Sequence, residues 1–223
     1  MRIVLCENIA QTENSNVFNA VRKMVLSSGL PVEPAKINKH WPRLSYGPTV
    51  AKGQRAEREY LDIYLQNFVS VADVKQRLEA VAPQGLHILT VERVPYPLPS
   101  VQNLAAAARY LVQGDFSRLN ASGREWEAFI GSDQIVITRR AENGLSFTLD
   151  GAPYLVDGRR RGPDEILCTL QCVQGKWIRP EWLIASWLGI EIPMEADVFT
   201  LDGICFTRQC LLWRDSQGQL HDL

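Results

Sequence analysis

The spacing of hydrophobic residues in the first part of the chain predicts a strand followed by a helix. Residues 2–7 form a short apolar run typical of a β-strand. Apolar side chains then recur at helical spacing, and Gly29 with Pro31 ends this pattern. The stripe consists of Val17, Phe18, Val21, Met24 and Val25.

A second strand–helix–strand pattern follows an irregular stretch at 32–57, in which Arg43 to Tyr46 form a short strand. Residues 60–65 alternate strictly, which predicts a half-buried strand with Leu61, Ile63 and Leu65 inward and Tyr60, Asp62 and Tyr64 outward. Ser70 and Asp73 resemble a helix capping box, and residues 86–94 are typical of another strand. The resulting order β-α-β-β-α-β predicts a ferredoxin-like lobe.

The second half of the chain repeats this order with an additional hairpin. Strands are expected at about 104–113, 134–140, 145–149, 165–173, 197–201 and 204–213. Helices are expected after a Ser122/Glu125 capping box and between Pro180 and Gly189, and Arg159–Arg161 are expected in a Gly-flanked loop.

Together these patterns predict an α+β protein of two ferredoxin-like lobes, each an antiparallel sheet with helices on one face. The expected boundaries are 1–95 for the first lobe, a Pro-rich linker at 96–103, and 104–223 for the second lobe.

Composition places the chain among cytoplasmic proteins without a membrane segment. No apolar run reaches the roughly 18 residues that a transmembrane helix needs, and the N-terminal apolar stretch is too short for a signal peptide. The five cysteines do not follow a zinc-ligand spacing, and the three histidines are scattered. We therefore expect neither disulfides nor a metal or other cofactor.

Charge is distributed unevenly along the chain and favours an anionic partner. Residues 1–113 hold 13 Lys/Arg and 9 Asp/Glu, a formal charge of +4, whereas the remainder holds 11 and 16, a charge of −5. Within the first half, residues 36–58 carry six basic residues and one acidic residue. Such an asymmetry is typical of a surface that contacts phosphate groups.

Four sequence blocks in the first lobe resemble the radical-SAM-linked protein family, a bacterial family of uncharacterised function. The blocks are Ala20–Lys23 running on to Ser28–Pro31, Pro42–Pro48, Glu59–Ile63 and Pro83–Leu86, with fainter agreement at Ile178–Glu181 and Thr207–Arg208. Members of that family stand alone or follow a radical-SAM domain. The resemblance therefore implies a partner that is a radical-SAM enzyme.

This chain departs from the family at two distinctive segments. Family members carry Ser-His-Leu-Asp at the start of the first helix, where this chain has Asn14–Phe18 without His or Asp. They also carry Gly-Phe-Asn-Pro before the Pro-Arg block, where this chain reads Asn38-Lys39-His40-Trp41-Pro42. The chain therefore resembles a diverged member that keeps the scaffold and a partner-binding role.

The residues that favour RNA contact combine cations with aromatic rings, because cations contact phosphates and aromatic faces stack on unpaired bases. In the first lobe they are Lys36, Lys39, His40, Trp41, Arg43, Tyr46, Lys52, Arg55 and Arg58. A second positive cluster is Arg159, Arg160 and Arg161, with Arg139 and Arg140 as candidate neighbours. A solvated loop is the alternative interpretation of both clusters.

Three hypotheses about function remain open at this point. The first is a non-catalytic RNA-binding or adaptor protein, and the chain contains no Gly-rich phosphate loop or Ser nucleophile motif that favours an enzyme. The second is a metal-independent endoribonuclease with His40 as its general base. The third is a protein-interaction subunit of a larger complex without RNA contact. The oligomeric state does not follow from the sequence.

Overall fold

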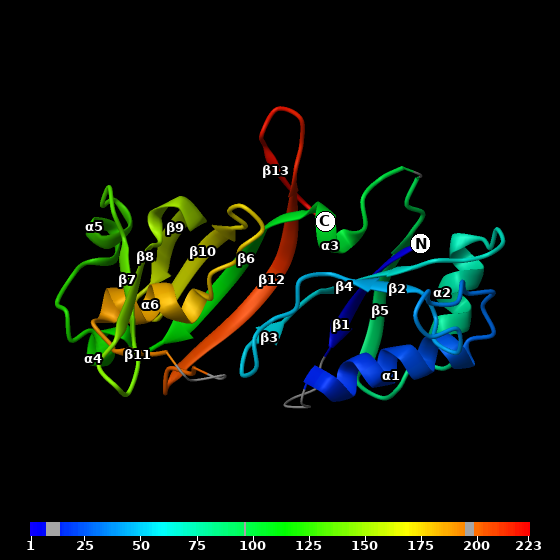
Figure 1. Cartoon of the computed structure of the whole chain (residues 1–223), viewed down its shortest axis with the longest axis horizontal. Helices are drawn as coiled ribbons and strands as arrows, with labels where there is room; N and C mark the ends of the chain where they lie inside the picture. The colour runs from blue at the N-terminus through cyan, green and yellow to red at the C-terminus, as the bar shows by residue number, and fades with distance from the viewer. Residues whose placement is uncertain (8–13, 96, 195–198) are drawn as a thin grey trace. The chain divides into compact units, whose positions relative to one another are not determined.

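The computed structural model describes residues 1–7, 14–95, 97–194 and 199–223. The chain is an α+β protein that divides into two compact units (Figure 1). The first unit comprises Met1–Lys52 and Ala56–Ala105, and the second comprises Gly53–Arg55 and Ala106–Leu223. A linker was expected at 96–103, and the described residues of that segment, 97–103, belong to the first unit.

The first unit contains a four-stranded antiparallel sheet with two helices on one face (Figure 1). Its elements in chain order are β1 (Arg2–Glu7), α1 (Asn14–Ser27), β2 (Leu44–Tyr46), β4 (Glu59–Ile63), α2 (Val71–Glu79), β5 (Leu86–Glu92) and α3 (Val101–Leu104). The sheet order β5-β1-β4-β2 is the ferredoxin-like order that the sequence predicts. Buried side chains of both long helices pack on this sheet.

Local sequence signals explain where α1 and α2 begin and end. The side chain of Ser70 accepts a hydrogen bond from the backbone N–H of Asp73 at 3.1 Å, which confirms the expected N-cap of α2. Gly29 has φ = +65°, a left-handed conformation that favours glycine and ends α1. The apolar stripe of α1 is buried at Val21, Met24 and Val25.

The outward side chains Tyr60 and Asp62 of β4 are buried, contrary to the sequence prediction. Tyr60 is 1% exposed and Asp62 is 5% exposed. The Arg2 guanidinium pairs with both carboxylate oxygens of Asp62, at 2.8 and 3.1 Å. The backbone N–H of Val101, the first residue of α3, donates to Asp62 Oδ2 at 2.7 Å. The alternation of residues 60–65 assigned side chains to the two faces of the strand correctly. It did not reveal that α3 covers the face on which Asp62 lies.

The second unit repeats the ferredoxin-like strand order. Its elements are β6 (Ala105–Gly114), α4 (Phe116–Leu119), α5 (Trp126–Ile130), β7 (Val136–Arg140), β8 (Ser146–Asp150), β9 (Leu155–Gly162), β10 (Glu165–Gln171), α6 (Pro180–Leu188), β11 (Ile192–Pro193), β12 (Ile204–Arg214) and β13 (Leu220–Asp222). The sheet runs β13-β12-β6-β10-β9, and within it the four strands β12-β6-β10-β9 follow the same order as in the first unit. The hairpin β7–β8 forms a separate three-stranded sheet with β11.

An aromatic cluster forms the core beneath α5 and α6. The rings of Trp126 and Trp187 lie 5.1 Å apart, Phe116 lies 5.4 Å from Trp187, and Phe129 lies 5.9 Å from Trp126. A Cβ atom on Gly158 of β9 would lie 3.0 Å from the Trp126 ring, so glycine permits this close contact. Trp126 and Trp187 are both buried in this core.

Some element boundaries of the second unit match the sequence prediction, and others differ from it. Pro180 occupies the first turn of α6, and Gly189 ends this helix in a left-handed conformation, both as expected. The expected capping box is absent, because Glu125 is the N-cap of α5 and the Ser122 hydroxyl donates to the Trp187 carbonyl instead. The strand expected at 197–201 falls partly on 197–198, outside the described residues, and 199–201 carry no strand.

Candidate nucleic-acid interface

The basic segment of the first unit begins with a tight loop between α1 and β2. The backbone of Ala35 donates to the carbonyl of Trp41 at 2.7 Å, and the backbone of His40 donates to Asn38 Oδ1 at 3.0 Å. These bonds close residues 35–41 into a turn, because Asn side chains readily bond backbone groups two residues on. The side chains that this loop exposes are Lys36, Ile37, Lys39, His40 and Trp41.

Trp41 stands at the surface beside a cation from α1. The guanidinium carbon of Arg22 lies 4.0 Å from the centre of the Trp41 ring, within the range of a cation–π contact. Trp41 remains 48% exposed, and neighbouring Ile37 is fully exposed. The sequence did not single out Arg22, because only the fold brings α1 beside the loop. We call Arg22, Lys36, Lys39, His40 and Trp41 the Trp41 platform.

An ion pair reduces the positive potential around Arg43. Its Nη1 atom lies 2.7 Å from Glu33 Oε2, and its guanidinium carbon lies 4.0 Å from the centre of the Tyr64 ring. The Glu33 carboxylate neutralises this cation locally. Arg43 therefore contributes more to the shape of the surface than to its positive potential.

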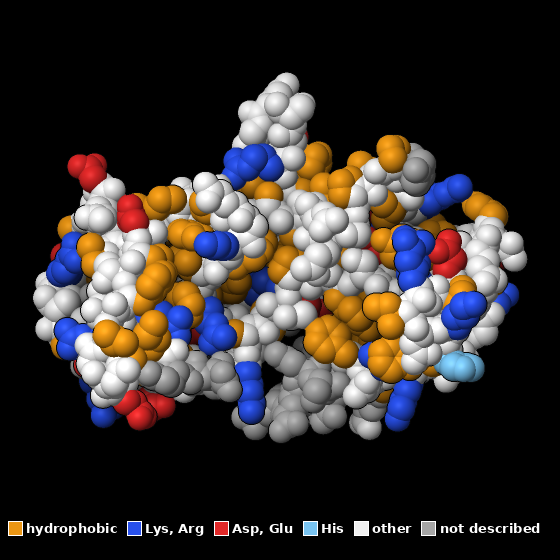
Figure 2. Space-filling view, in the orientation of Figure 1, with side chains coloured by type: hydrophobic (Ala, Val, Ile, Leu, Met, Phe, Trp, Pro, Cys, Tyr) orange, Lys and Arg blue, Asp and Glu red, His pale blue; other side chains and the backbone are white. Residues whose placement is uncertain are grey.

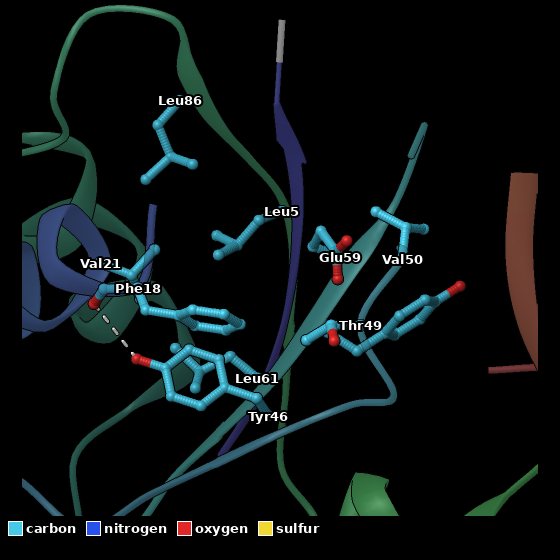
Figure 3. Close-up of a pocket in the computed structure, with 10 residues that line it drawn as sticks. Leu5, Phe18, Val21, Tyr46, Thr49, Val50, Glu59, Leu61 and Leu86 are labelled. Atoms are coloured by element: carbon cyan, nitrogen blue, oxygen red, sulfur yellow. Dashed lines mark hydrogen bonds between the residues drawn. The ribbon is translucent and has the colours of Figure 1, made fainter. Parts of the chain in front are cut away.

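Tyr46 turns toward the interior of the first unit. Its ring meets the Phe18 ring edge to face at 4.6 Å, and its hydroxyl donates to the Phe18 carbonyl at 3.5 Å, the dashed line in Figure 3. Burial raises the pKa of the Tyr46 phenol to about 12. A side chain held in this way does not offer its ring to a stacked base.

The remaining basic residues of the segment are Lys52, Arg55 and Arg58. Lys52 and Arg58 are exposed in the first unit, and Arg58 also has an interaction partner. Arg55 is exposed but belongs to the second unit. On the face that Figure 2 shows, the basic side chains of the first unit, in the right half, are dispersed among hydrophobic ones.

The second positive cluster lies on a strand and not in a loop, which corrects the sequence prediction. Arg159, Arg160 and Arg161 belong to β9, at the edge of the sheet. Arg160 turns toward α5, where its Nη1 atom lies 4.0 Å from Glu125 Oε2, and its Nη2 atom donates to the Pro163 carbonyl. Arg159 and Arg161 are exposed, and charged side chains commonly protect an edge strand from pairing with other chains.

Arg139 and Arg140 make contacts of their own in the hairpin β7–β8. Arg139 lies over the Trp182 ring at 4.5 Å and donates to the Met194 carbonyl at 2.5 Å. Arg140 Nη1 lies 4.0 Å from Glu191 Oε2. None of these contacts involves the three arginines of β9.

A buried carboxylate in the second unit escaped the sequence analysis. Glu181 is 2% exposed at the start of α6, and Gln54 Nε2 donates to its Oε1 atom at 2.6 Å. Its Oε2 atom is buried without a hydrogen-bond partner among the described residues. Desolvation raises the pKa of Glu181, and the hydrogen bond from Gln54 opposes this shift. Only the fold brings Gln54 and Glu181 together, since 127 positions separate them.

The four cysteines whose side chains the structure describes are free thiols. Cys168, Cys172, Cys205 and Cys210 form no disulfide, and burial raises the pKa of Cys168 to about 12. Across residues 1–7, 14–95, 97–194 and 199–223, no three His, Cys, Asp or Glu side chains lie close enough to hold a metal ion. The helices in the same ranges are all too short or too polar to cross a membrane.

Comparison with known proteins places the chain in a family but gives no activity. The family described as an uncharacterised protein conserved in bacteria (DUF2344) matches residues 16–180, from α1 to the first residue of α6. No curated protein matches the chain. The match covers most of the 223 residues, and the chain therefore belongs to this bacterial family of uncharacterised proteins.

Proposed function

We propose that this protein is a non-catalytic, cytoplasmic RNA-binding adaptor that contacts single-stranded RNA through the Trp41 platform. The observation that carries the proposal is the contact between Arg22 and the half-exposed Trp41 ring on a loop that also exposes Lys36 and Lys39. Single-stranded RNA binders commonly combine aromatic or guanidinium planes for the bases with cations for the phosphates.

The platform satisfies both requirements within a short stretch of surface. A base stacks on the indole ring or on the Arg22 guanidinium plane, because both surfaces are flat and polarisable. Lys36, Lys39 and His40 stand exposed on the same loop and form no ion pair among the described residues. The charges of the two lysines are thus available to a phosphate backbone.

A second candidate function is that of a protein adaptor for a radical-SAM enzyme. The sequence blocks resemble a family whose members stand alone or follow a radical-SAM domain. Ile37 is fully exposed next to the half-exposed Trp41, and exposed apolar side chains of this kind are typical of protein contacts. We do not extend the proposal to RNA cleavage, because no described side chain orients the His40 ring as a general base requires.

The first test compares two aromatic variants in an RNA titration. We expect Trp41→Ala to weaken binding of a fluorescently labelled oligouridine by about fivefold or more, because one stacked base contributes roughly 1–3 kcal/mol. Phe68→Ala is the matched control. Phe68 is 75% exposed and lies 5.0 Å from the Arg93 guanidinium carbon, so it is another arginine–aromatic pair of the first unit but lies outside the basic segment.

The two alternatives give different results in the same titration, followed by fluorescence anisotropy. Equal loss in Trp41→Ala and Phe68→Ala would show that the contact is not specific to the platform. Absence of binding by the unaltered protein at low salt would reject RNA contact and leave the protein-adaptor candidate. Shortening of the oligouridine during the titration would restore the endoribonuclease hypothesis.

A further inference from the structure

The hairpin β7–β8 of the second unit leaves one edge of its sheet open. The sheet runs β11-β7-β8, so among the described strands β8 pairs on one side only (Figure 1). The side chains of Ser146, Phe147 and Thr148 on β8 are all exposed. Phe147 is 50% exposed, and Leu145, directly before the strand, is 66% exposed. The second unit thus presents a surface strand with apolar side chains beside an unpaired edge.

The register of the hairpin determines which backbone groups of β8 face this edge. The backbone N–H of Ala141 donates to the Leu145 carbonyl at 2.8 Å, and that of Gly151 donates to the Ile135 carbonyl at 2.7 Å. Residue pairs of antiparallel strands alternate between those that exchange backbone hydrogen bonds and those that do not. The odd-numbered residues of β8 therefore bond to β7. The residues whose N–H and C=O groups point to the open edge are Ser146, Thr148 and Asp150.

The β8 edge lacks the features that commonly protect an edge strand. Basic side chains, proline and bulges keep such strands from pairing with other chains. The edge strand β9 of the other sheet in this unit carries the exposed Arg159 and Arg161. Residues 145–150 contain no Lys, Arg or Pro, and the register of β8 with β7 is continuous. An edge of this kind is a template for an added strand.

We propose that the β8 edge pairs with the β8 edge of a second copy of this chain, in an antiparallel arrangement centred on Thr148. In this register Thr148 lies opposite its own counterpart, and Ser146 lies opposite Asp150 of the second copy. These pairs exchange the backbone hydrogen bonds that each free edge leaves open. The two three-stranded sheets thereby become one continuous sheet.

Side chains on both faces of the joined sheet are complementary in this register. On one face, Phe147 lies opposite Leu149 of the second copy, and the two-fold symmetry repeats this apolar pair. On the other face, the Thr138 and Thr148 hydroxyls lie 3.4 Å apart within the hairpin. Pairing of Thr148 with its counterpart extends this contact into a row of threonines across the join, an arrangement that stabilises antiparallel strands.

Charge complementarity favours this register over its neighbours. Arg140 and Ser146 are cross-strand neighbours in the hairpin. Adjacent strands lie about 4.8 Å apart, so Asp150 of the second copy stands about 10 Å from the Arg140 backbone, across the small Ser146 side chain. Arg140 also lies 4.0 Å from Glu191 Oε2, but its side chain is 61% exposed, and a guanidinium has five N–H donors to share between two carboxylates. A shift of the register by two residues in either direction removes this opposition of charges.

The proposal does not depend on RNA binding, because β8 lies in the second unit and the Trp41 platform in the first. Sedimentation velocity of the full chain at increasing concentration measures the association. We expect a monomer–dimer equilibrium with a Kd on the order of 100 µM, because an interface confined to strand edges is small. Thr148→Pro removes an N–H that does not bond to β7 and should abolish the dimer.

A charge reversal with a matched control tests the register. Arg140→Glu places a carboxylate near Asp150 of the second copy and should weaken the dimer by about fivefold or more, since the symmetry repeats the repulsion. Arg161→Glu makes the same change on the edge strand β9 and should leave the Kd unchanged.

Amide hydrogen exchange, followed by NMR at low and high protein concentration, decides the outcome even if Thr148→Pro fails to fold. The amides of Ser146, Thr148 and Asp150 should become more protected at high concentration, whereas those of Phe147 and Leu149 should change little because they already bond to β7. A monomer at every concentration would overturn the proposal, whether or not an extended segment of another protein pairs with this edge. So would a dimer that leaves the first three amides unprotected, or equal weakening by Arg140→Glu and Arg161→Glu.

Discussion

Replacement of Asp62 by alanine is expected to lower the free energy of unfolding by about 3–5 kcal/mol. The Arg2 and Asp62 side chains are only 9% and 7% exposed, so the variant leaves the Arg2 guanidinium buried without its counter-ion. It also removes the acceptor of the Val101 backbone N–H. A buried donor without an acceptor adds its own desolvation penalty. Urea denaturation followed by circular dichroism measures this loss.

A surface ion pair of the same unit provides the matched control. Glu33→Ala removes the partner of Arg43, but these side chains are 37% and 41% exposed. An exposed pair contributes only about 0.2–1 kcal/mol, because water and salt screen both charges. A double replacement, Arg2→Met with Asp62→Leu, should recover much of the lost stability by removing both buried charges. If Asp62→Ala lowered the free energy of unfolding no more than Glu33→Ala does, this account of the buried pair would be contradicted.

Glu181 is expected to make the stability of the second unit depend on pH. Its pKa is raised in the folded protein, so the folded state holds the proton more tightly than the unfolded state does. The associated stability is present below the ordinary value of 4.5 and is lost as pH rises toward the folded-state pKa. Each unit of pKa difference corresponds to about 1.4 kcal/mol.

The variant Glu181→Gln removes this titration but keeps an oxygen that accepts from Gln54. As pH rises above 4.5, we expect the unaltered protein to lose stability relative to Glu181→Gln. Glu127→Gln, on an exposed residue of α5, should instead follow the unaltered protein. Thermal unfolding at several pH values measures the difference. Parallel pH profiles of the unaltered protein and Glu181→Gln would show that Glu181 is not responsible.

The sequence predicted those parts of the fold that short-range signals determine. The Ser70 and Asp73 pair capped a helix as expected, and Pro180 and Gly189 delimited another. These signals act through backbone geometry within one turn, so no distant contact is needed to interpret them. The ferredoxin-like order of both units followed from the sequence of such elements.

Predictions were wrong where a distant segment determines the outcome. The glycines around Arg159–Arg161 indicated a loop, but Gly158 is a strand residue that makes room for Trp126. Asp62 lies on the outward face of its strand as the alternation indicated, yet α3 covers that face. Composition cannot reveal such long-range packing, because it depends on elements far apart along the chain.

The candidate interface was predicted as a set of charges but not as an arrangement. The sequence identified Trp41 and its neighbouring lysines, which the structure places together on one loop. It did not reveal that Arg22 joins Trp41, that Glu33 neutralises Arg43, or that Tyr46 turns inward. Pairing of charges and direction of side chains are three-dimensional properties.

The salt dependence of oligouridine binding tests the central claim most directly. Each phosphate contact to single-stranded RNA contributes about −0.7 to the slope of log K against log salt concentration. Lys36→Ala with Lys39→Ala should therefore reduce the steepness by about 1.4. Arg159→Ala with Arg161→Ala removes the same charge from β9 and should leave the slope of the unaltered protein. Equal reduction by both double variants, or no binding by the unaltered protein at low salt, would contradict the assignment of RNA contact to the Trp41 platform.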